Sequence, residues 1–426
     1  MRSITHFLGE YVFYYPLITS LIWVLGGMTY YFRMRRGDQA DELVSEREPY
    51  VSILVPARNE GPQIEETIRK ILDSNYTNFE IIIINDASWD NTKEIVENLM
   101  KEDKRIRLLN LKENMGKASA MNYALLVSKG EIIVTIDADC SPEKDCLSMM
   151  VGHFVKYPRV GAVTGNPRIK NQENLLTQVQ ASEYSSIIGL IKRSQRMLGK
   201  IFTVSGVIAA FRKRALLDAG LWSNNMLTED IDITWKLEAK CWDVRFEENA
   251  ICWIITPKTL KGLLKQRLRW CGGGAQVIKK HANIWKNPEM RRMWPIYIDY
   301  ILSVTWAYVF IICLCYWTAQ ALFNIGSDAA VLGNPIPAWR GAVIGAVCLV
   351  QLLTGIILDK NLKKDALRTC FYAIWFPVVY WFLYSISVVV ATPIGLFKKF
   401  DKPVKWVSPE REAPAIIKVF GTAGKR

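Results

Sequence analysis

The stretch EIIVTIDADC, residues 131–140, is an apolar run that ends in two aspartates separated by one alanine. Such a run predicts a strand buried on both faces of a sheet. Asp137 and Asp139 then lie at its carboxyl end, where open parallel α/β sheets bind ligands. Two carboxylates there can hold a hard divalent cation, which can in turn hold a diphosphate. The same D-x-D spacing recurs at Asp230 and Asp232, so only its surroundings can give the first pair a function.

Upstream of this strand, short apolar runs alternate with segments whose apolar residues recur at helical spacing. The series predicts a mostly parallel sheet with helices on both faces, as in Rossmann-like α/β domains. Ser141 followed by Pro142 predicts the N-cap and first turn of the next helix. The predicted strands are Val51–Val55, Phe79–Ile84 and Ile106–Leu109, and the predicted helices include 64–72 and Ala118–Ser128.

Four apolar runs have about the 20 residues that a bilayer requires. The first, Tyr11–Phe32, is followed at once by RMRR and has no cleavage site of small residues. We therefore predict an uncleaved anchor with the basic cluster in the cytoplasm. The loop before the last run is also basic and predicted to be cytoplasmic, whereas the side of the C-terminal tail stays open. The other runs are Ile296–Phe323, Gly341–Leu358 and Cys370–Leu396.

The net charge of +13 comes with Lys and Arg grouped beside apolar runs, as in 398–405. This grouping favours anionic membrane lipids over nucleic acid as the partner. Leu175–Leu198 and Thr259–Val277 are amphipathic and basic, so we expect helices that lie in the membrane interface. The predicted parts are an anchor over 1–36, a cytoplasmic α/β domain over 37–255, interfacial helices over 256–295, transmembrane helices over 296–397 and a basic tail over 398–426.

The residue types available for chemistry exclude several classes of protein. Nine cysteines form no C-x-x-C pair and the three histidines lie far apart, so neither a disulfide framework nor a zinc site is predicted. No G-x-G-x-x-G follows a strand and no G-x-x-x-x-G-K-[ST] is present, which argues against hydride transfer and ATP hydrolysis. Catalysis is therefore expected to depend on carboxylates and a metal.

Polar residues after the first two strands share the sheet edge of the first D-x-D and could bind a nucleotide. Ala57, Asn59 and Glu60 follow the first strand. Asp86 ends the second, where its carboxylate can accept a hydrogen bond from a base imide. Equally, such residues often only make turns and cap helices. Lys117, which follows Gly116 at a helix start, is a candidate phosphate contact.

The segment QRLRW supplies a second group of candidates. On a helix, Gln266, Arg269 and Trp270 fall at i, i+3 and i+4, so an amide, a guanidinium and an indole share one face. That face could clamp a phosphate and stack against a sugar ring. The alternative is that a basic amphipathic helix of this kind binds only lipid headgroups.

The segment Thr228-Glu229-Asp230 offers the best candidate for a general base, with Asp230 accepting a proton from a hydroxyl. A competing interpretation is that Thr228 caps a helix running to Ala239. Both acids would then only favour its positive end. The local spacing does not decide between the two.

Taken in order, the strand, D-x-D, T-E-D and Q-x-x-R-W resemble the processive family 2 glycosyltransferases, which include cellulose, chitin and hyaluronan synthases. Within that group the chain is most similar to bacterial poly-β-1,6-N-acetylglucosamine synthases. The resemblance spans nearly the whole chain, up to Trp406-Val407-Ser408-Pro409. The blocks that carry it are AVTGNPRI, EYSSIIGLIKRSQ, VSGVIAAFR, TEDIDITWKL and LKQRLRW.

This resemblance implies a GT-A fold and a bacterial inner-membrane enzyme with a cytoplasmic catalytic domain. It implies UDP-N-acetylglucosamine as donor, Mg²⁺ or Mn²⁺ as cofactor, an inverting reaction, a growing polysaccharide as product and a small membrane accessory subunit. The matched positions make Asp86 the uridine-binding aspartate, Asp139 the metal ligand with Asp137 beside it, and Asp230 the base. Gln266, Arg269 and Trp270 are placed near the diphosphate and acceptor, and Arg168 of AVTGNPRI near substrate.

Two departures from the family pattern are small: Ala87 stands where Gly is usual, and Cys271-Gly272 replaces a commoner Ala-Gln.

Three alternatives stay open. A synthase of the chitin or hyaluronan type would keep every candidate residue. A non-processive transferase acting on a lipid carrier would not need the Q-x-x-R-W face, and a non-enzymatic nucleotide-sugar sensor would tolerate loss of Asp230.

Overall fold

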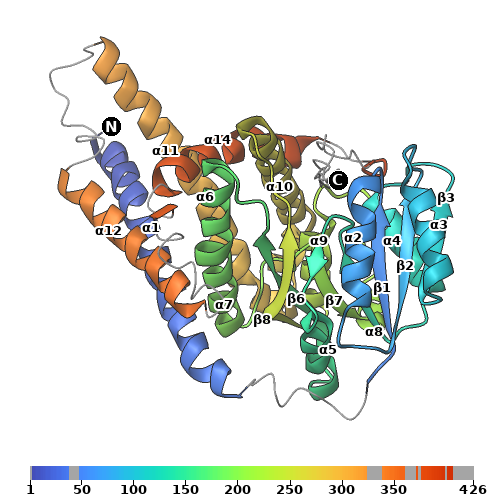
Figure 1. Cartoon of the computed structure of the whole chain (residues 1–426). Helices are drawn as coiled ribbons and strands as arrows, with labels where there is room; N and C mark the ends of the chain where they lie inside the picture. Colours follow the sequence, from blue (N-terminus) through green and yellow to red (C-terminus); the bar gives the residue numbers. More distant parts are fainter. Residues whose placement is uncertain are drawn as a thin grey trace, which may run out of the picture.

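A computed structural model of the chain describes residues 2–37, 48–323, 338–359, 371–372, 376–398 and 401–405. Four of its helices are long and apolar enough to cross a membrane, as the sequence predicted. Two of them, α1 and α12, lie side by side at the left of Figure 1, away from the sheet. The four are α1 (Arg2–Gly37), α11 (Trp294–Phe323), α12 (Ala338–Leu358) and α14 (Phe376–Phe397).

The sheet has eight strands in the order β3-β2-β1-β4-β7-β6-β8-β5. Strands β1 to β4 are parallel to one another, whereas β7 runs antiparallel to both of its neighbours. This is the predicted mixed, mostly parallel sheet. The strands are β1 (Val51–Ala57), β2 (Phe79–Asp86), β3 (Ile106–Leu111), β4 (Ile132–Ile136), β5 (Ser141–Pro142), β6 (Val160–Ile169), β7 (Ile208–Arg212) and β8 (Asp243–Ile254).

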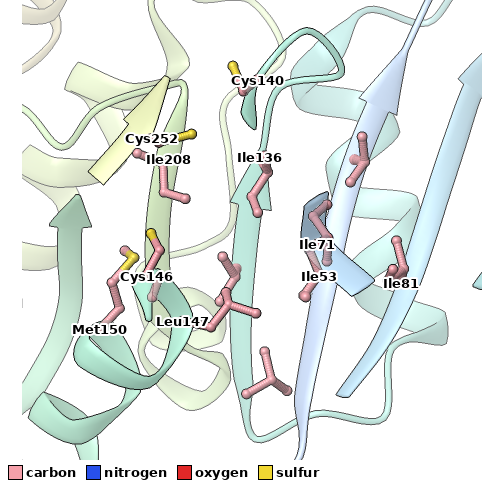
Figure 2. Close-up of a cluster of buried hydrophobic side chains, with 14 of the residues drawn as sticks. Ile53, Ile71, Ile81, Ile136, Cys140, Cys146, Leu147, Met150, Ile208 and Cys252 are labelled. Carbon is pink, nitrogen blue, oxygen red and sulfur yellow. The ribbon is translucent and has the colours of Figure 1, made fainter. Parts of the chain in front are cut away.

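Helices cover both faces of the sheet because successive strand residues point to opposite sides. Ile53 and Ile81 pack in one buried cluster with α2, α3 and α5, and Figure 2 shows part of it. Leu54 and Ile82 pack in a second cluster with α4, α8 and α9. These helices are α2 (Gly61–Leu72), α3 (Thr92–Glu102), α4 (Lys117–Val127), α5 (Cys146–Lys156), α8 (Lys213–Asp218) and α9 (Glu229–Ala239).

The prediction that Ser141 and Pro142 begin a helix is wrong. They form the short edge strand β5, which pairs antiparallel with Cys252 and Trp253 of β8, and α5 begins only at Cys146. An edge strand tolerates proline because one side of its backbone needs no ladder partner.

The predicted helix Leu175–Leu198 is divided into α6 (Leu175–Glu183), a single π-helical turn η2 (Tyr184–Ile188) and α7 (Gly189–Leu198). Not all of its basic residues are exposed. Lys192 and Arg193 are buried, and Arg193 forms an ion pair of 2.8 Å with Glu248 of β8. This part of α7 therefore packs on the α/β domain.

The second predicted interfacial helix is α10 (Leu260–Lys280), whose N-terminus is capped by the side chain of Thr259. Two short 3₁₀ turns, η3 (Ala282–Lys286) and η4 (Pro288–Met293), connect it to α11. Pro393 lies inside α14. The basic loop before the last run, which was predicted to be cytoplasmic, lies outside the described residues from 360 to 370, as does the block Trp406–Pro409.

Candidate active site

The carboxyl ends of β1, β2 and β4 meet at one edge of the sheet, where the candidate residues gather. Ala57 at the end of β1 pairs with Asn85 of β2, and both are buried. β4 covers the five apolar or β-branched residues of this stretch and ends at Ile136, so Asp137 follows it directly and Asp139 two positions later, as predicted. The backbone N–H of Asp137 donates to the carbonyl of Val207 at 3.1 Å, which holds this turn against the segment before β7.

Lys117, the first residue of α4, joins two of the candidate acids. Its ammonium donates to Asp137 Oδ1 at 2.6 Å and lies 3.4 Å from Glu229 Oε1. Burial disfavours the charged ammonium, but these carboxylates more than compensate and raise the pKa of Lys117. Burial raises the pKa of Asp137, and Asp139 adds to that effect while Lys117 opposes it. The carboxylates that act on this one ammonium are Asp137, Glu229 and Asp230, so acidic groups outnumber the basic one.

Asp230 lies in the first turn of α9 and faces the turn that contains Gly206. The N–H of Gly206 donates to Asp230 Oδ2 at 3.1 Å, and the N–H of Ile231 donates to Oδ1 at 2.9 Å. A Cβ on Gly206 would lie 2.8 Å from Asp230 Oδ2, so this approach requires glycine. Burial, and then the charge of Glu229, raise the pKa of Asp230 to about 6. A carboxylate with that pKa is suited to general base catalysis near neutral pH.

Thr228 immediately precedes α9, but its side chain makes no capping hydrogen bond. The alternative that it serves as a side-chain cap is therefore wrong. Its side chain packs against α10, where a Cβ on Gly273 would lie 2.2 Å from Thr228 Oγ1. The close contact sets the distance between the T-E-D segment and the helix that carries Q-x-x-R-W.

The candidate nucleotide residues are held in an ordered pair of turns. Asp86 is buried, and its two carboxylate oxygens accept the N–H groups of Met115 at 2.7 Å and Gly116 at 3.0 Å. Asn59 accepts the N–H of Trp89 at 3.0 Å. Asn59 and Ala87 both have φ of +54°, a left-handed conformation that costs alanine more than glycine. The turn-forming role that the sequence left open is thus observed, and Asp86 keeps acceptor capacity for a ligand.

Glu60 is buried at the start of α2, where its N–H donates to Thr92 Oγ1 at 2.9 Å. It begins the helix, and its backbone carbonyl accepts from Gln63 and Ile64. Val404, in the C-terminal tail, donates its N–H to the carbonyl of Asn224 at 2.8 Å. The carbonyl oxygen of Val404 contacts Gly116. The described part of the tail thus contacts two loops of the site.

On α10, Arg269 donates to the carbonyl of Leu227 at 3.2 Å, and its positive charge lowers the pKa of Asp230. Gln266 is half-buried. Trp270 packs against the main core cluster, with the guanidinium of Arg267 4.5 Å from its ring centroid. Arg269 is therefore the member of the predicted face that lies beside the candidate base.

Two charged residues near Trp270, Arg267 and Glu183, were not predicted from the sequence as part of the site. Arg267 forms a buried ion pair of 2.6 Å with Glu183, which ends α6 next to the π-helical turn. Burial raises the pKa of Glu183, and that same carboxylate raises the pKa of Arg267 against the effect of burial. The only sequence indication was a second arginine inside QRLRW.

Arg168, predicted to contact substrate, pairs with Asp359, which directly follows α12, and both side chains are buried. This ion pair joins β6 to a candidate membrane helix. The two residues are 191 positions apart, so the sequence offered no indication of the pairing.

The residues after β4 fit a divalent cation. Within the described residues, no three His, Cys, Asp or Glu side chains form a metal site by themselves. Mg²⁺ commonly takes only one or two protein carboxylates and completes its shell with phosphate oxygens and water. Asp137 and Asp139 supply such a pair, and the excess negative charge around Lys117 favours a cation there.

A family-level sequence profile, Glycosyl transferase family 2, matches residues 52–219. The poly-beta-1,6-N-acetyl-D-glucosamine synthase of Staphylococcus epidermidis is 33% identical over 94% of this chain and 98% of its own. The chain belongs to the family 2 glycosyltransferases. The synthase of the same name from Staphylococcus aureus is 34% identical over the same shares. The family profile spans Asp86, Lys117 and the first D-x-D but ends before Asp230.

A mannosyltransferase from Pyrobaculum calidifontis, solved with GDP-Man and Mn²⁺, has the same fold. Its TM-score is 0.58 at 21% identity, and the match covers 84% of this chain and 99% of that one. The α/β domain is thus a GT-A glycosyltransferase domain, and members of this class generally use a divalent metal ion. The expected fold class is confirmed.

Proposed function

We propose that the chain is an inverting, processive synthase that transfers N-acetylglucosamine from UDP-N-acetylglucosamine to a growing poly-β-1,6-N-acetyl-D-glucosamine chain. The observation that carries the proposal is the convergence of Asp137, Lys117, Glu229 and Asp230 at the sheet edge. Similarity over almost the full length of two synthases of that name supports the choice of sugar.

The donor half of the site consists of Asp86 and the D-x-D pair. Asp86, already fixed by two backbone amides, is placed to accept a hydrogen bond from uracil. Asp139 and Asp137 would hold Mg²⁺ or Mn²⁺, which when bound offsets negative charge on the diphosphate. Lys117 lies between the two D-x-D segments and offers a fixed positive charge toward the same phosphates.

The acceptor half centres on Asp230. Its carboxylate takes the proton of the acceptor 6-hydroxyl while the oxygen bonds to the anomeric carbon of the donor. The bond from that carbon to the diphosphate breaks, and UDP leaves from the opposite face, so the configuration inverts. Arg269 lies beside Asp230 and is placed to contact the departing diphosphate or the incoming sugar.

The membrane helices fit a polymer that is extended on the cytoplasmic side of the bacterial inner membrane and led outward. Trp270 is half-buried and follows Arg269 in the chain, and we infer that an acceptor sugar stacks on the accessible part of its indole. We expect the helices to contact membrane lipids and a small accessory subunit, because the described spans are only four.

The test supplies the full-length protein, purified with lipids, with labelled UDP-N-acetylglucosamine and Mg²⁺ or Mn²⁺. We expect a long polymer that a β-1,6-specific hexosaminidase digests. Parallel reactions receive UDP-glucose or UDP-glucuronic acid. Short lipid-linked product would contradict the processive mechanism, and a polymer that requires another donor would contradict the choice of sugar.

A further inference from the structure

Lys192 of α7 is a buried cation without a close counter-charge. Its residue is 7% exposed, and its ammonium donates to Thr164 Oγ1 at 3.2 Å. The ammonium also lies 5.7 Å from the ring centroid of Phe246. Within the described part of the chain, no carboxylate lies within 4.0 Å of it. Burying a charge without a counter-charge costs free energy, so a buried Lys192 is expected to have a function that offsets this cost.

The hydroxyl of Thr164 connects this ammonium to the backbone that holds Asp230. Besides accepting from Lys192, Thr164 Oγ1 accepts the N–H of Ser205 at 2.8 Å. The next residue, Gly206, donates its N–H to Asp230 and accepts Lys117 at its carbonyl, 2.9 Å away. Lys192, through Thr164, and Lys117, directly, therefore both hold the Ser205–Gly206 turn.

The segment before this turn depends on side chains because it lies outside helices and strands. The N–H groups of Ile201, Phe202 and Val204 are accepted by three side chains of α7 and α9. The acceptors are Glu238 at 2.9 Å, Gln195 at 3.0 Å and Thr234 at 2.9 Å. A buried backbone group left without a partner is costly, so these contacts fix the path of the segment that leads to Gly206.

The charges around Asp230 show what the ammonium adds. Glu229 on the same helix opposes ionisation of Asp230, whereas Lys117 of α4 and Arg269 of α10 favour it. Lys192 approaches from α7, on a third side. Burial lowers the pKa of Lys192 to about 8, and the negative charge of Asp230 opposes that decrease. The electrostatic interaction is mutual, so a positive Lys192 also favours the carboxylate form of Asp230.

We propose that Lys192 is a positioning residue for Asp230. Its ammonium orients the Thr164 hydroxyl, which holds the Ser205–Gly206 turn against the carboxylate, and its charge keeps that carboxylate ionised. The inference depends on the proposed role of Asp230 as the base. It assigns Lys192 no contact with substrate.

The experiment measures UDP release by the full-length protein from pH 5 to 9 in Lys192→Met, Lys192→Gln and Lys192→Arg. In Lys192→Met we expect the acid limb of the kcat profile to move up by about one pH unit. kcat at pH 6 should fall several-fold more than at pH 8, and KM for UDP-N-acetylglucosamine should change less than about twofold. Lys192→Arg keeps the charge and should restore the wild-type limb.

Two further variants separate charge from hydrogen bonding. Lys192→Gln can still donate to Thr164, so it should show the same upward shift, and it carries the test if Lys192→Met does not fold. Thr164→Val breaks the clamp but keeps the ammonium, so it should lower kcat equally at every pH. Lys240→Met removes an exposed lysine just after α9 and should leave the profile unchanged.

A pH-independent loss in both neutral Lys192 variants, or no change in either, would overturn the inference. Asp230→Asn separates this failure from a failure of the proposed function. If Asp230→Asn is inactive while the Lys192 variants keep the wild-type profile, only the role of Lys192 is wrong. If Asp230→Asn is as active as the wild type, the assignment of the base is wrong as well.

Discussion

The two D-x-D segments have the same letters but different geometry. Asp137 and Asp139 follow a strand at the same sheet edge, and Asp137 pairs with Lys117 there. Asp230 and Asp232 lie on α9, where two positions correspond to a rotation of about 200°. Asp230 consequently faces the Gly206 turn and Asp232 faces away from it. Identical spacing thus places both aspartates at the candidate site when they follow a strand, but only one of them when they lie on a helix.

Asp232 has become an anchor for α10. Its fully buried carboxylate accepts from Lys280 at 2.7 Å and from His281 at 3.2 Å, at the C-terminal end of that helix. Burial alone would raise the pKa of Asp232, but His281 and Lys280 lower it below its usual value. The second pair therefore divides its tasks: Asp232 holds the Q-x-x-R-W helix against α9, and Asp230 is the acid that we propose for the reaction.

Asp230→Asn tests the different roles of Asp230 and Asp232 most directly, because an amide of the same shape cannot take a proton. We expect kcat to fall about a thousandfold, within the range typical of a lost general base. Binding of UDP, measured by calorimetry, should stay within a few-fold of wild type because Asp230 is not placed in the donor half. Wild-type turnover in Asp230→Asn would show that the second segment does not supply the general base.

Asp139→Asn should have the next largest effect on turnover. It removes one of two metal-binding carboxylates, so we expect about a hundredfold lower activity at limiting metal, partly regained at high Mn²⁺. Chelation of divalent ions should abolish wild-type activity reversibly. Asp232→Asn serves as the matched control, since it should leave the dependence on metal concentration unchanged. An equal metal dependence in wild type and Asp139→Asn would contradict the assignment.

A change of pH should affect the two acids of the second segment, Asp230 and Asp232, unequally. The raised pKa of Asp230, about 6, means that the base becomes protonated below pH 6. We expect turnover to fall about tenfold per pH unit below that point. Asp232, with its lowered pKa, stabilises the fold above the ordinary aspartate pKa and loses that effect only at still lower pH. Thermal stability should therefore not decrease between pH 7 and pH 5 while activity falls, because Asp232 stays ionised and protonation of the buried Asp230 favours the fold.

The strands and their polar ends could be predicted because they follow from local pattern. β4 and its aspartates came from one apolar run, and α9 ends at Ala239 as expected. Lys117 was identified as a candidate, but its pairing with Asp137, 20 positions away, was not predicted. Periodicity shows that a segment is helical, whereas its contacts depend on residues that the fold brings close.

For that reason, the sequence could not predict which basic side chains of these helices are buried. A lysine on an amphipathic helix beside membrane spans normally faces headgroups. Lys192 is instead buried because Thr164, 28 positions earlier, offers a hydroxyl under α7. Arg168 likewise pairs with Asp359, far along the chain. Thr228 has the sequence of a helix cap, but its contact with Gly273 of α10 replaces that role.

Asp232→Asn should have the smallest effect on turnover and a large effect on stability. It removes the charge that Lys280 and His281 share in a buried position, which costs about 3 kcal/mol of unfolding free energy. We expect a lower melting temperature, with kcat within about threefold of wild type well below it, because Asp230 keeps its own contacts. Asp73→Asn breaks an exposed pair with Lys144 and should cost less than about 1 kcal/mol. If Asp232→Asn lost turnover as completely as Asp230→Asn without a change in melting temperature, both acids would belong to the reaction, and the rotation of α9 would not separate them.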